Sequence, residues 1–354
     1  GRYIVSRIEP HTWPAIPWTP DVTFFCPVFA EPWGPWRLHR DGMGGSEESV
    51  VYLANELAAR GIRVQVYAPL DSMHRGVHVE AGVRWRPLEA LDAIKRVPGK
   101  VIAHRAPYAV RLSSFTPKDI AIWHQDASYM MGWTPEVARA VGHLWASQWQ
   151  KTELLGQIGI DSEEDLGTVC GNGIPHSAAN AWEDGNKRDP LACAYLSSPT
   201  RGLQQLLEIW PEVESRLPGA TLNIFYGWNT APRIRGMKEL REKIHELVAA
   251  QPRSVKWRGR IAQTALEALL PTMGVWAYPT MFPEGFAIAG IRATAAGLVP
   301  VYRKVAAMEE VQYPSPFAVE GKPWEDGGRE EFTDALCAAL KASQSDEFNR
   351  HDAR

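Results

Sequence analysis

Short apolar runs alternate with segments of helical period along most of this 354-residue chain. Residues 22–28 form an apolar run, residues 50–57 repeat apolar side chains every three or four positions, and residues 62–66 alternate again. This order predicts strand, helix, strand units, which build parallel sheets covered by helices on both faces. Further apolar runs in the first half lie at 101–103, 120–123 and 144–146.

The same alternation starts again in the second half, beyond a stretch at 171–190 that is rich in turn formers and charges. Strands are predicted there at 191–196, 221–226, 255–257, 275–278 and 299–302, with helices between them. The expected fold is therefore of the α/β class, with two Rossmann-like, doubly wound domains that face a cleft.

The length of the chain suits two domains, each large enough to bury its own core. We expect an extended Pro- and Trp-rich lead-in over residues 1–20 and a first domain over residues 21–185. A second domain is expected over residues 186–328, and a C-terminal helix with a polar tail over residues 329–354.

The composition is ordinary for a soluble globular protein, with 45% hydrophobic and 22% charged residues. We expect a cytoplasmic protein without a membrane span, since no apolar run is long enough to cross a bilayer and no leader-like segment opens the chain. The net charge of -3 gives no general attraction to nucleic acid, so a nucleic-acid acceptor is unsupported but stays open. The four cysteines lack a paired short spacing, which argues against a zinc site.

Glu284 and Gly285 stand between the predicted strand at 275–278 and a predicted helix at 286–296. A helix start offers unpaired backbone N–H groups and a positive dipole end, which suit a pyrophosphate. A carboxylate at this point can accept hydrogen bonds from sugar hydroxyls. The local alternative is that Glu284 only caps the helix.

Two further stretches of the first half are candidates for ligand contact. His124, Gln125 and Asp126 come directly after the strand at 120–123, where open parallel sheets place ligand-contacting groups. Gly44 and Gly45 stand before the first long helix, where glycine leaves room for the backbone to approach a ligand.

Together these stretches resemble the retaining GT-B glycosyltransferases of the large glycosyltransferase family 4. The likeness rests first on Glu284 to Ile288, followed by a helix that ends in residues 295–301. Other stretches that fall in the order of the family are Gly44-Gly45-Ser46-Glu47, Ser147-Gln148-Trp149, Gly171-Asn172-Gly173-Ile174-Pro175, Arg201-Gly202-Leu203 and Trp257-Arg258-Gly259. The resemblance spans about residues 22–342.

The resemblance implies a transferase of the hexosyltransferase type that takes a sugar from a UDP- or GDP-linked donor and keeps its anomeric configuration. The first domain would select the acceptor and the second would bind the nucleotide-sugar, which is a co-substrate; no cofactor or metal is implied. By this likeness Arg201 neutralises the donor diphosphate, Glu284 contacts hydroxyls of the transferred sugar, and His124 lies near that sugar. Further donor contacts would come from Gly44, Gly45, Gly285, Phe286, Ala287 and Ile288.

Two positions depart from the family pattern. Tyr195 stands where an Arg commonly lies six positions before Arg201, and Arg292 replaces the second Glu, which binds the nucleotide ribose. A guanidinium cannot accept hydrogen bonds from ribose hydroxyls. Both residues would adjoin the donor, and they motivate an alternative, a catalytically weak or inactive nucleotide-sugar-binding protein.

Other enzymes on the same plan stay open, such as an inverting transferase or an epimerase, for which Asp126 or His124 would serve as general base. A Rossmann dehydrogenase is disfavoured because no Gly-x-Gly-x-x-Gly turn follows the first strand, and a metal-dependent single-domain transferase because no Asp-x-Asp pair occurs. The acceptor is open among lipid, saccharide, protein, small metabolite and modified nucleobase.

Overall fold

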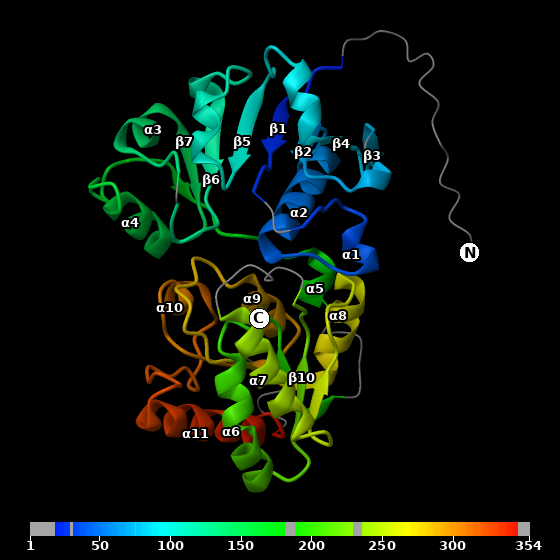
Figure 1. Cartoon of the computed structure of the whole chain (residues 1–354), viewed down its shortest axis with the longest axis vertical. Coiled ribbons are helices and arrows are strands. Elements are labelled where there is room, and N and C mark those ends of the chain that lie inside the picture. The colour runs from blue at the N-terminus through cyan, green and yellow to red at the C-terminus, as the bar shows by residue number, and fades with distance from the viewer. Residues whose placement is uncertain are drawn as a thin grey trace.

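The computed structural model describes residues 18–28, 31–74, 76–129, 131–180, 188–228 and 236–345. Within these residues the chain forms two sheets that belong to two domains, the first drawn above the second (Figure 1). The expected boundary between residues 185 and 186 lies outside the described residues, as do most of the lead-in and the end of the polar tail.

The first domain is built on an eight-stranded sheet with the order β3-β4-β2-β1-β5-β6-β7-β8. Neighbouring strands are parallel except for the antiparallel pair of β3 and β4. The strands are β1 (Val22–Phe25), β2 (Val64–Ala68), β3 (His78–Glu80), β4 (Val83–Pro87), β5 (Lys100–His104), β6 (Ile120–Trp123), β7 (Gly142–Trp145) and β8 (Thr168–Val169).

Both faces of this sheet are covered. Phe24 and Phe25, neighbours on β1, point to opposite faces and join two separate buried clusters. The helices are α1 (Arg37–Arg40), α2 (Gly45–Ala59), α3 (Pro135–Ala140) and α4 (Gln148–Gly156), with short 3-10 segments at Ser72–His74, Leu88–Ala93, Pro107–Arg111 and Pro117–Asp119. The near-continuous burial of the strands is typical of a parallel sheet between two helical layers.

The second domain carries a five-stranded, fully parallel sheet with the order β11-β10-β9-β12-β13. Its strands are β9 (Asp189–Tyr195), β10 (Thr221–Ile224), β11 (Val255–Trp257), β12 (Met273–Tyr278) and β13 (Val299–Tyr302). The helices are α6 (Leu203–Arg216), α7 (Met237–Ala249), α8 (Gln263–Leu269), α9 (Ile288–Ala295), α10 (Met308–Val311) and α11 (Asp326–Ala342), with a 3-10 segment at Leu270–Thr272. The short helix α5 (His176–Asn180) packs against α9, so the chain reaches this domain before its first strand.

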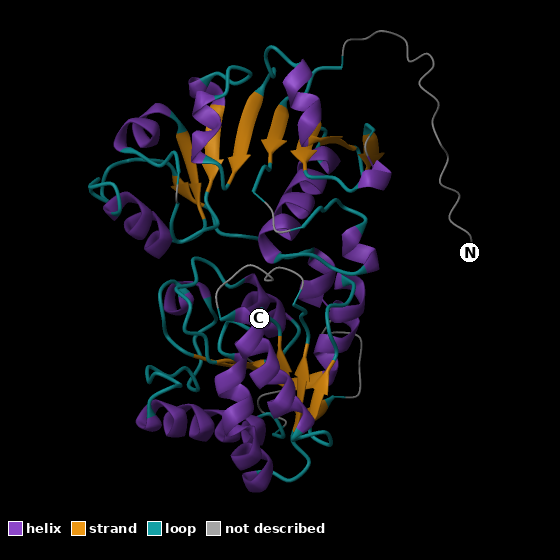
Figure 2. Cartoon of the chain, viewed as in Figure 1, coloured by secondary structure: helices purple, strands orange, loops and turns teal. Residues whose placement is uncertain are grey.

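The predicted fold class is confirmed, since two Rossmann-like halves with helices between parallel strands are present (Figure 2). The helix predicted from residue 286 begins two residues later, because Ala287 has non-helical backbone angles, φ -89° and ψ 83°. The sequence pattern gave no prediction for β3, β4, β8, α1, α5 or α10. No helix in the described ranges is long and apolar enough to cross a membrane.

Candidate functional site

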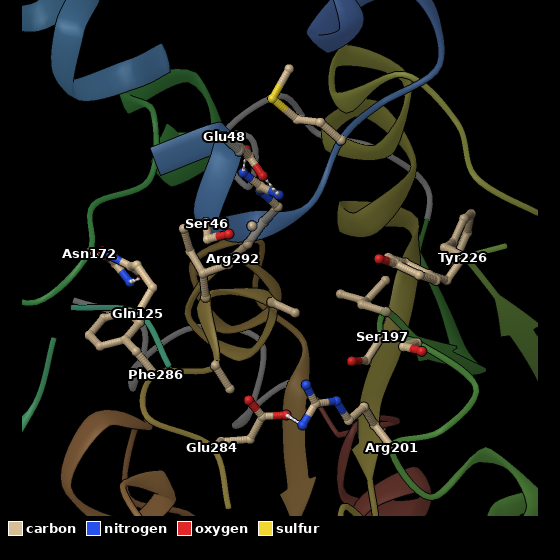
Figure 3. A pocket seen from close by; sticks show the side chains of 18 of the residues that line it. Ser46, Glu48, Gln125, Asn172, Ser197, Arg201, Tyr226, Glu284, Phe286 and Arg292 are labelled. Carbon is tan, nitrogen blue, oxygen red and sulfur yellow. Dashed lines mark hydrogen bonds and ion pairs between the residues drawn. The ribbon is translucent and has the colours of Figure 1, made fainter. Parts of the chain in front are cut away.

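The carboxyl ends of strands from both domains meet around three adjoining cavities. The central cavity, of about 280 Å³, is lined from the first domain by Ser46 and Arg105 and from the second by Tyr226, Glu284 and Arg292. Arg105 and Tyr226 lie just beyond the ends of β5 and β10, where doubly wound folds bind ligands. Figure 3 shows Glu284 and Arg201 facing each other at one end of the central cavity and Glu48 and Arg292 at the other.

Two further cavities, each of about 470 Å³, adjoin the central one. We call the first the aromatic cavity, because Trp149 and Phe282 line it, and the second the arginine cavity, because Arg105, Arg201 and Arg260 line it. Arg201 lines all three cavities, so they converge at its guanidinium.

Glu284 is held in place by its neighbours in the second domain. Its Oε1 accepts a hydrogen bond of 2.5 Å from the hydroxyl of Tyr278, the last residue of β12, and lies 3.5 Å from Arg201 Nη1. Its backbone carbonyl accepts the N–H of Ala307. Burial and the nearby Glu284 carboxylate raise the pKa of Tyr278, so the hydroxyl stays protonated and remains a donor. The Glu284 side chain is 14% exposed and faces the cavities.

Arg201 sits in the turn between β9 and α6, with its guanidinium carbon 3.1 Å from the centre of the Phe282 ring. Gly202, with φ 91°, follows it; a Cβ there would lie 2.1 Å from the carbonyl oxygen of Pro279, so only glycine permits this close turn. Arg201 Nη1 is buried and makes no hydrogen bond to any described residue. Its only polar contact there is the 3.5 Å ion pair with Glu284, so this donor has no hydrogen bond among the described residues.

The start of α9 closes the central cavity from the second domain. Phe286, Ala287 and Ile288 line the central cavity and Gly285 lines the aromatic one. The N–H groups of Phe286 and Ala287 precede the helix rather than forming its first turn.

The predicted glycine loop lies opposite the start of α9. Gly44 is the N-cap of α2 and lines the arginine cavity, and Gly45 lines both that cavity and the central one. A Cβ on Gly45 would come within 2.7 Å of the Ile288 side chain, so the glycine permits the helix starts of the two domains to approach.

Arg292 lines the central cavity, but its guanidinium is engaged with a carboxylate. Its Nη1 donates to Glu48 Oε2 over 3.2 Å and its Nη2 donates to Glu48 Oε1. Gln263 Nε2 also donates to Glu48 Oε2, at 2.6 Å. Glu48 comes from α2 of the first domain, so this buried group ties the two domains together.

Two predicted site residues lie outside the three cavities. His124 is fully buried, stacks on Trp145 at 3.9 Å between ring centres, and hydrogen-bonds Tyr129 and His143 through its two ring nitrogens. Burial holds the pKa of His124 well below its usual value. Tyr195 is also fully buried and its hydroxyl donates to the carbonyl of Ser198. The structure therefore shows both side chains supporting the strand ends and not facing the cavities.

Two arginines that line the cavities were not predicted from the sequence. Arg105, directly after β5, has a φ of 60° and donates from Nε and Nη2 to both carboxylate oxygens of Asp126, at 2.9 and 2.7 Å. Arg260, after β11, donates to Glu31 and to the carbonyl of Gly42, both in the first domain. Their position after strand ends was the available signal, since the same rule singled out His124.

Glu310 on α10 makes another contact between the domains. Its carboxylate accepts the backbone N–H groups of Gln148 at 2.6 Å and Trp149 at 2.9 Å, at the start of α4 in the first domain. An anion at this point satisfies unpaired helix donors. No group of three or more His, Cys, Asp or Glu that could hold a metal ion occurs among the residues that the structure describes.

Neither a protein-family model nor a curated protein matches the sequence. Solved structures do resemble it. HepE from Anabaena, in complex with UDP and glucose, is 16% identical and aligns over 94% of this chain and 96% of its own, with a TM-score of 0.59. Sucrose-phosphate synthase from Thermosynechococcus elongatus is 13% identical over 93% of this chain and 96% of its own, with a TM-score of 0.61.

A UDP-forming α,α-trehalose-phosphate synthase from Burkholderia xenovorans is 12% identical over 95% of this chain and all of its own, with a TM-score of 0.57. These alignments run through both domains. The chain therefore has the GT-B fold of these glycosyltransferases, two Rossmann-like domains with the cavities between them.

Proposed function

We propose that the protein is a glycosyltransferase that moves a sugar from a nucleotide-sugar donor to an acceptor with retention of anomeric configuration. One observation carries this proposal: the guanidinium of Arg201 lies 3.5 Å from the Glu284 carboxylate where all three cavities meet, and its Nη1 makes no hydrogen bond to a described residue. A guanidinium with an unused hydrogen-bond donor next to a fixed carboxylate suits a diphosphate joined to a sugar, because each group has a partner of matching chemistry.

In this proposal Arg201 binds the donor diphosphate and Glu284 accepts hydrogen bonds from hydroxyls of the transferred sugar. Negative charge grows on the diphosphate as the glycosidic bond breaks, and a fixed guanidinium stabilises that charge without reorganising. The backbone N–H groups before α9, at Phe286 and Ala287, would hold the phosphates from the other side of the central cavity. HepE was crystallised with UDP and glucose, which makes a UDP-linked donor the first choice for this chain.

Retention is favoured over inversion by the state of the two residues that could act as general base. Both carboxylate oxygens of Asp126 accept hydrogen bonds from Arg105. His124 lies in the core of the first domain, with both ring nitrogens engaged. His124 is therefore not placed to take a proton from an acceptor, and Asp126, which lines the central and aromatic cavities, is a weakened base because Arg105 pairs with both of its oxygens.

The test combines binding and turnover. UDP, UDP-glucose and the matching GDP compounds are first screened for a rise in the thermal midpoint, since a ligand that binds only the folded state stabilises it. Nucleotide release is then followed with an acceptor panel, and the anomeric configuration of any product is assigned by NMR. Arg201→Gln should lower kcat about 100- to 1,000-fold. Arg258→Gln is the matched control, because Arg258 bonds Asn223 and lines none of the three cavities.

The possible results distinguish a retaining transferase from an inverting one and from a binding protein. Release of nucleotide with a retained anomer supports the proposal, and an inverted product contradicts the retaining mechanism. Stabilisation by nucleotide-sugars without release under any acceptor would show a binding protein, the alternative that Arg292 motivates. If no nucleotide-sugar stabilises the protein or is consumed, the proposal is wrong.

A further inference from the structure

The aromatic cavity shares the proposed reaction centre but has walls of its own. It has Asp126, Arg201 and Glu284 in common with the central cavity. Its remaining walls include Trp149, Glu153 and Gln157 from α4 in the first domain and Phe282 and Pro283 from the second. A molecule in this cavity would thus lie next to a sugar held by Glu284.

We propose that the aromatic cavity is the acceptor site and that the acceptor is an uncharged, hydroxyl-rich ring compound, that is, a saccharide. This inference rests on the glycosyltransferase function proposed above. The volume of about 470 Å³ lies within the usual range for small-molecule sites and leaves room for a sugar ring. Trp149 contributes a broad apolar face, on which the C–H face of a sugar ring can be buried, and Phe282 adds the ring face and edge that Arg201 does not cover.

The polar groups on α4 match hydroxyls. Gln157 Nε2 donates to Glu153 Oε1 at 3.1 Å and to the carbonyl of Ala127 at 2.8 Å, which fixes both side chains on the wall. Glu153 Oε2 and Gln157 Oε1 make no hydrogen bond to any described residue, so both oxygens can accept hydrogen bonds from a ligand. Two oxygen acceptors four residues apart on one helix face can bind separate hydroxyl groups of one ring.

The charges of the cavity disfavour a phosphorylated acceptor. Three carboxylates, Asp126, Glu153 and Glu284, line it against a single guanidinium, that of Arg201. Asp126 is paired with Arg105, and Glu284 lies beside Arg201, but Glu153 has no ion-pair partner among the described residues. An anion placed here would meet an uncompensated carboxylate. The arginine cavity, with three guanidinium groups against Glu31 and Glu47, would suit an anionic acceptor better than this one.

The aromatic cavity is assembled by contact between the two domains. Glu310 of the second domain accepts the N–H groups of Gln148 and Trp149 at the start of α4. The helix that carries Trp149, Glu153 and Gln157 is thereby docked against the domain that holds Glu284. Acceptor and donor would meet only in this docked arrangement.

The experiment compares uncharged acceptors with their phosphate esters, using the nucleotide-sugar that the screen identifies. Glucose, galactose and maltose are each paired with the corresponding sugar phosphate. The expected kcat/KM is at least about 10-fold higher for the uncharged member of the preferred pair. Trp149→Ala should raise the acceptor KM about 10-fold or more and leave the donor KM within about twofold, while Trp149→Phe, which keeps a ring, should retain most of the affinity.

A charge reversal tests the electrostatic part. Glu153→Lys should reduce or reverse the preference for the uncharged acceptor, because it changes the net charge of the wall toward positive. Glu163→Lys makes the same change on an exposed residue of the first domain that lines none of the three cavities, and should leave the preference unchanged.

The inference fails, with the proposed function intact, if the enzyme transfers sugar but prefers phosphorylated acceptors, or if a folded Trp149→Ala variant keeps the acceptor KM of the parent. It also fails alone if transfer to lipid or protein is observed and no saccharide is used. Absence of both donor binding and nucleotide release would instead overturn the proposed function, and this inference with it.

Discussion

Glu48 on α2 and Arg292 on α9 form an ion pair that joins the two domains and is almost completely buried, with side-chain exposures of 1% and 4%. The position that the family pattern assigns to a ribose-binding carboxylate thus carries a cation, and the carboxylate comes from the other domain. Since Gln263 also donates to Glu48, the carboxylate is well satisfied within the protein. Removing one partner would leave a buried charge without compensation.

Arg292→Glu should therefore destabilise the protein by about 3–5 kcal/mol, because it places two carboxylates together in a buried site. The free energy of unfolding from urea titration checks this. Arg60→Glu is the control at the exposed end of α2, where the Arg60–Glu56 pair is 71% and 60% exposed. Its effect should stay within about 1 kcal/mol.

Exchanging the two charges tests whether the loss in Arg292→Glu comes from the broken ion pair or from another effect of the substitution. The double variant Glu48→Arg with Arg292→Glu should recover a large part of the lost free energy, because opposite charges again face each other across the domains. A double variant that is as unstable as the sum of its two single variants would contradict the pairing.

Tyr278→Phe tests how Glu284 is positioned. Loss of a hydrogen bond to a charged group costs about 1.5–3 kcal/mol, so kcat for sugar transfer should fall about 10- to 100-fold with little change in the donor KM. Tyr302→Phe is a matched control, because Tyr302 pairs with Tyr278 in the register of β12 and β13 but its hydroxyl donates to the carbonyl of Tyr313. Equal losses in both variants would show that Tyr278 has no specific role.

The pH dependence of stability follows from the buried histidines of the first domain. Burial lowers the pKa of His104, His124 and His143 below the ordinary value of 6.5. The unfolded chain binds these protons below pH 6.5 and the folded protein does not, so the free energy of unfolding is at its full value above that pH and falls as the pH decreases. Between pH 7.5 and 5.5 the loss should reach about 1.4 kcal/mol for each of His104 and His124, whose pKa values burial holds well below the ordinary value, with a smaller contribution from His143.

A variant that lacks one of these histidines tests whether they cause the pH dependence of stability. His104→Phe keeps an aromatic ring beside Trp123 and removes one titrating group, so its loss over the same pH range should be smaller by about 1.4 kcal/mol. Urea titrations at several pH values measure both proteins. The same pH dependence in both would assign the loss to other groups.

Glu310→Gln tests the contact that docks α4 on the second domain. The uncharged amide can still accept one N–H but no longer offers two carboxylate oxygens, so a loss of about 0.5–2 kcal/mol is expected. Glu309→Gln, the neighbouring change, should have a smaller effect, since the Glu309 side chain is 72% exposed. If α4 positions the acceptor, Glu310→Gln also raises the acceptor KM, and Glu309→Gln does not.

The sequence predicted the sheets well because buried parallel strands are continuous apolar runs, as in β6 and β12, whose boundaries it placed within two residues. The hairpin of β3 and β4 was missed although Val83 and Trp85 alternate inward and Ala81 and Gly82 both have positive φ in the turn. A two-residue turn with positive φ at both positions is a recognisable hairpin pattern, but here the two strands are short and lie beside a polar segment.

Glu284, Arg201 and the start of α9 line one cavity, because the adjacent parallel strands β9 and β12 bring the turns that follow them to the same edge of the sheet. The roles expected for these residues stay predictions. The partnership of Arg292 with Glu48 could not be derived, since it joins residues 244 positions apart in different domains. His124 obeys the strand-end rule, yet its ring turns into the core because Trp145 and His143 offer it a better environment there.

The convergence of three cavities on Arg201 also bears on how such an enzyme could diverge. A change at this position alters the surroundings of both substrates at once, so a gain for one is tied to a loss for the other. Residues that line a single cavity, such as Trp149 or Gln157, are free of that constraint. New substrate preferences should therefore arise at the periphery of the site and spare its centre.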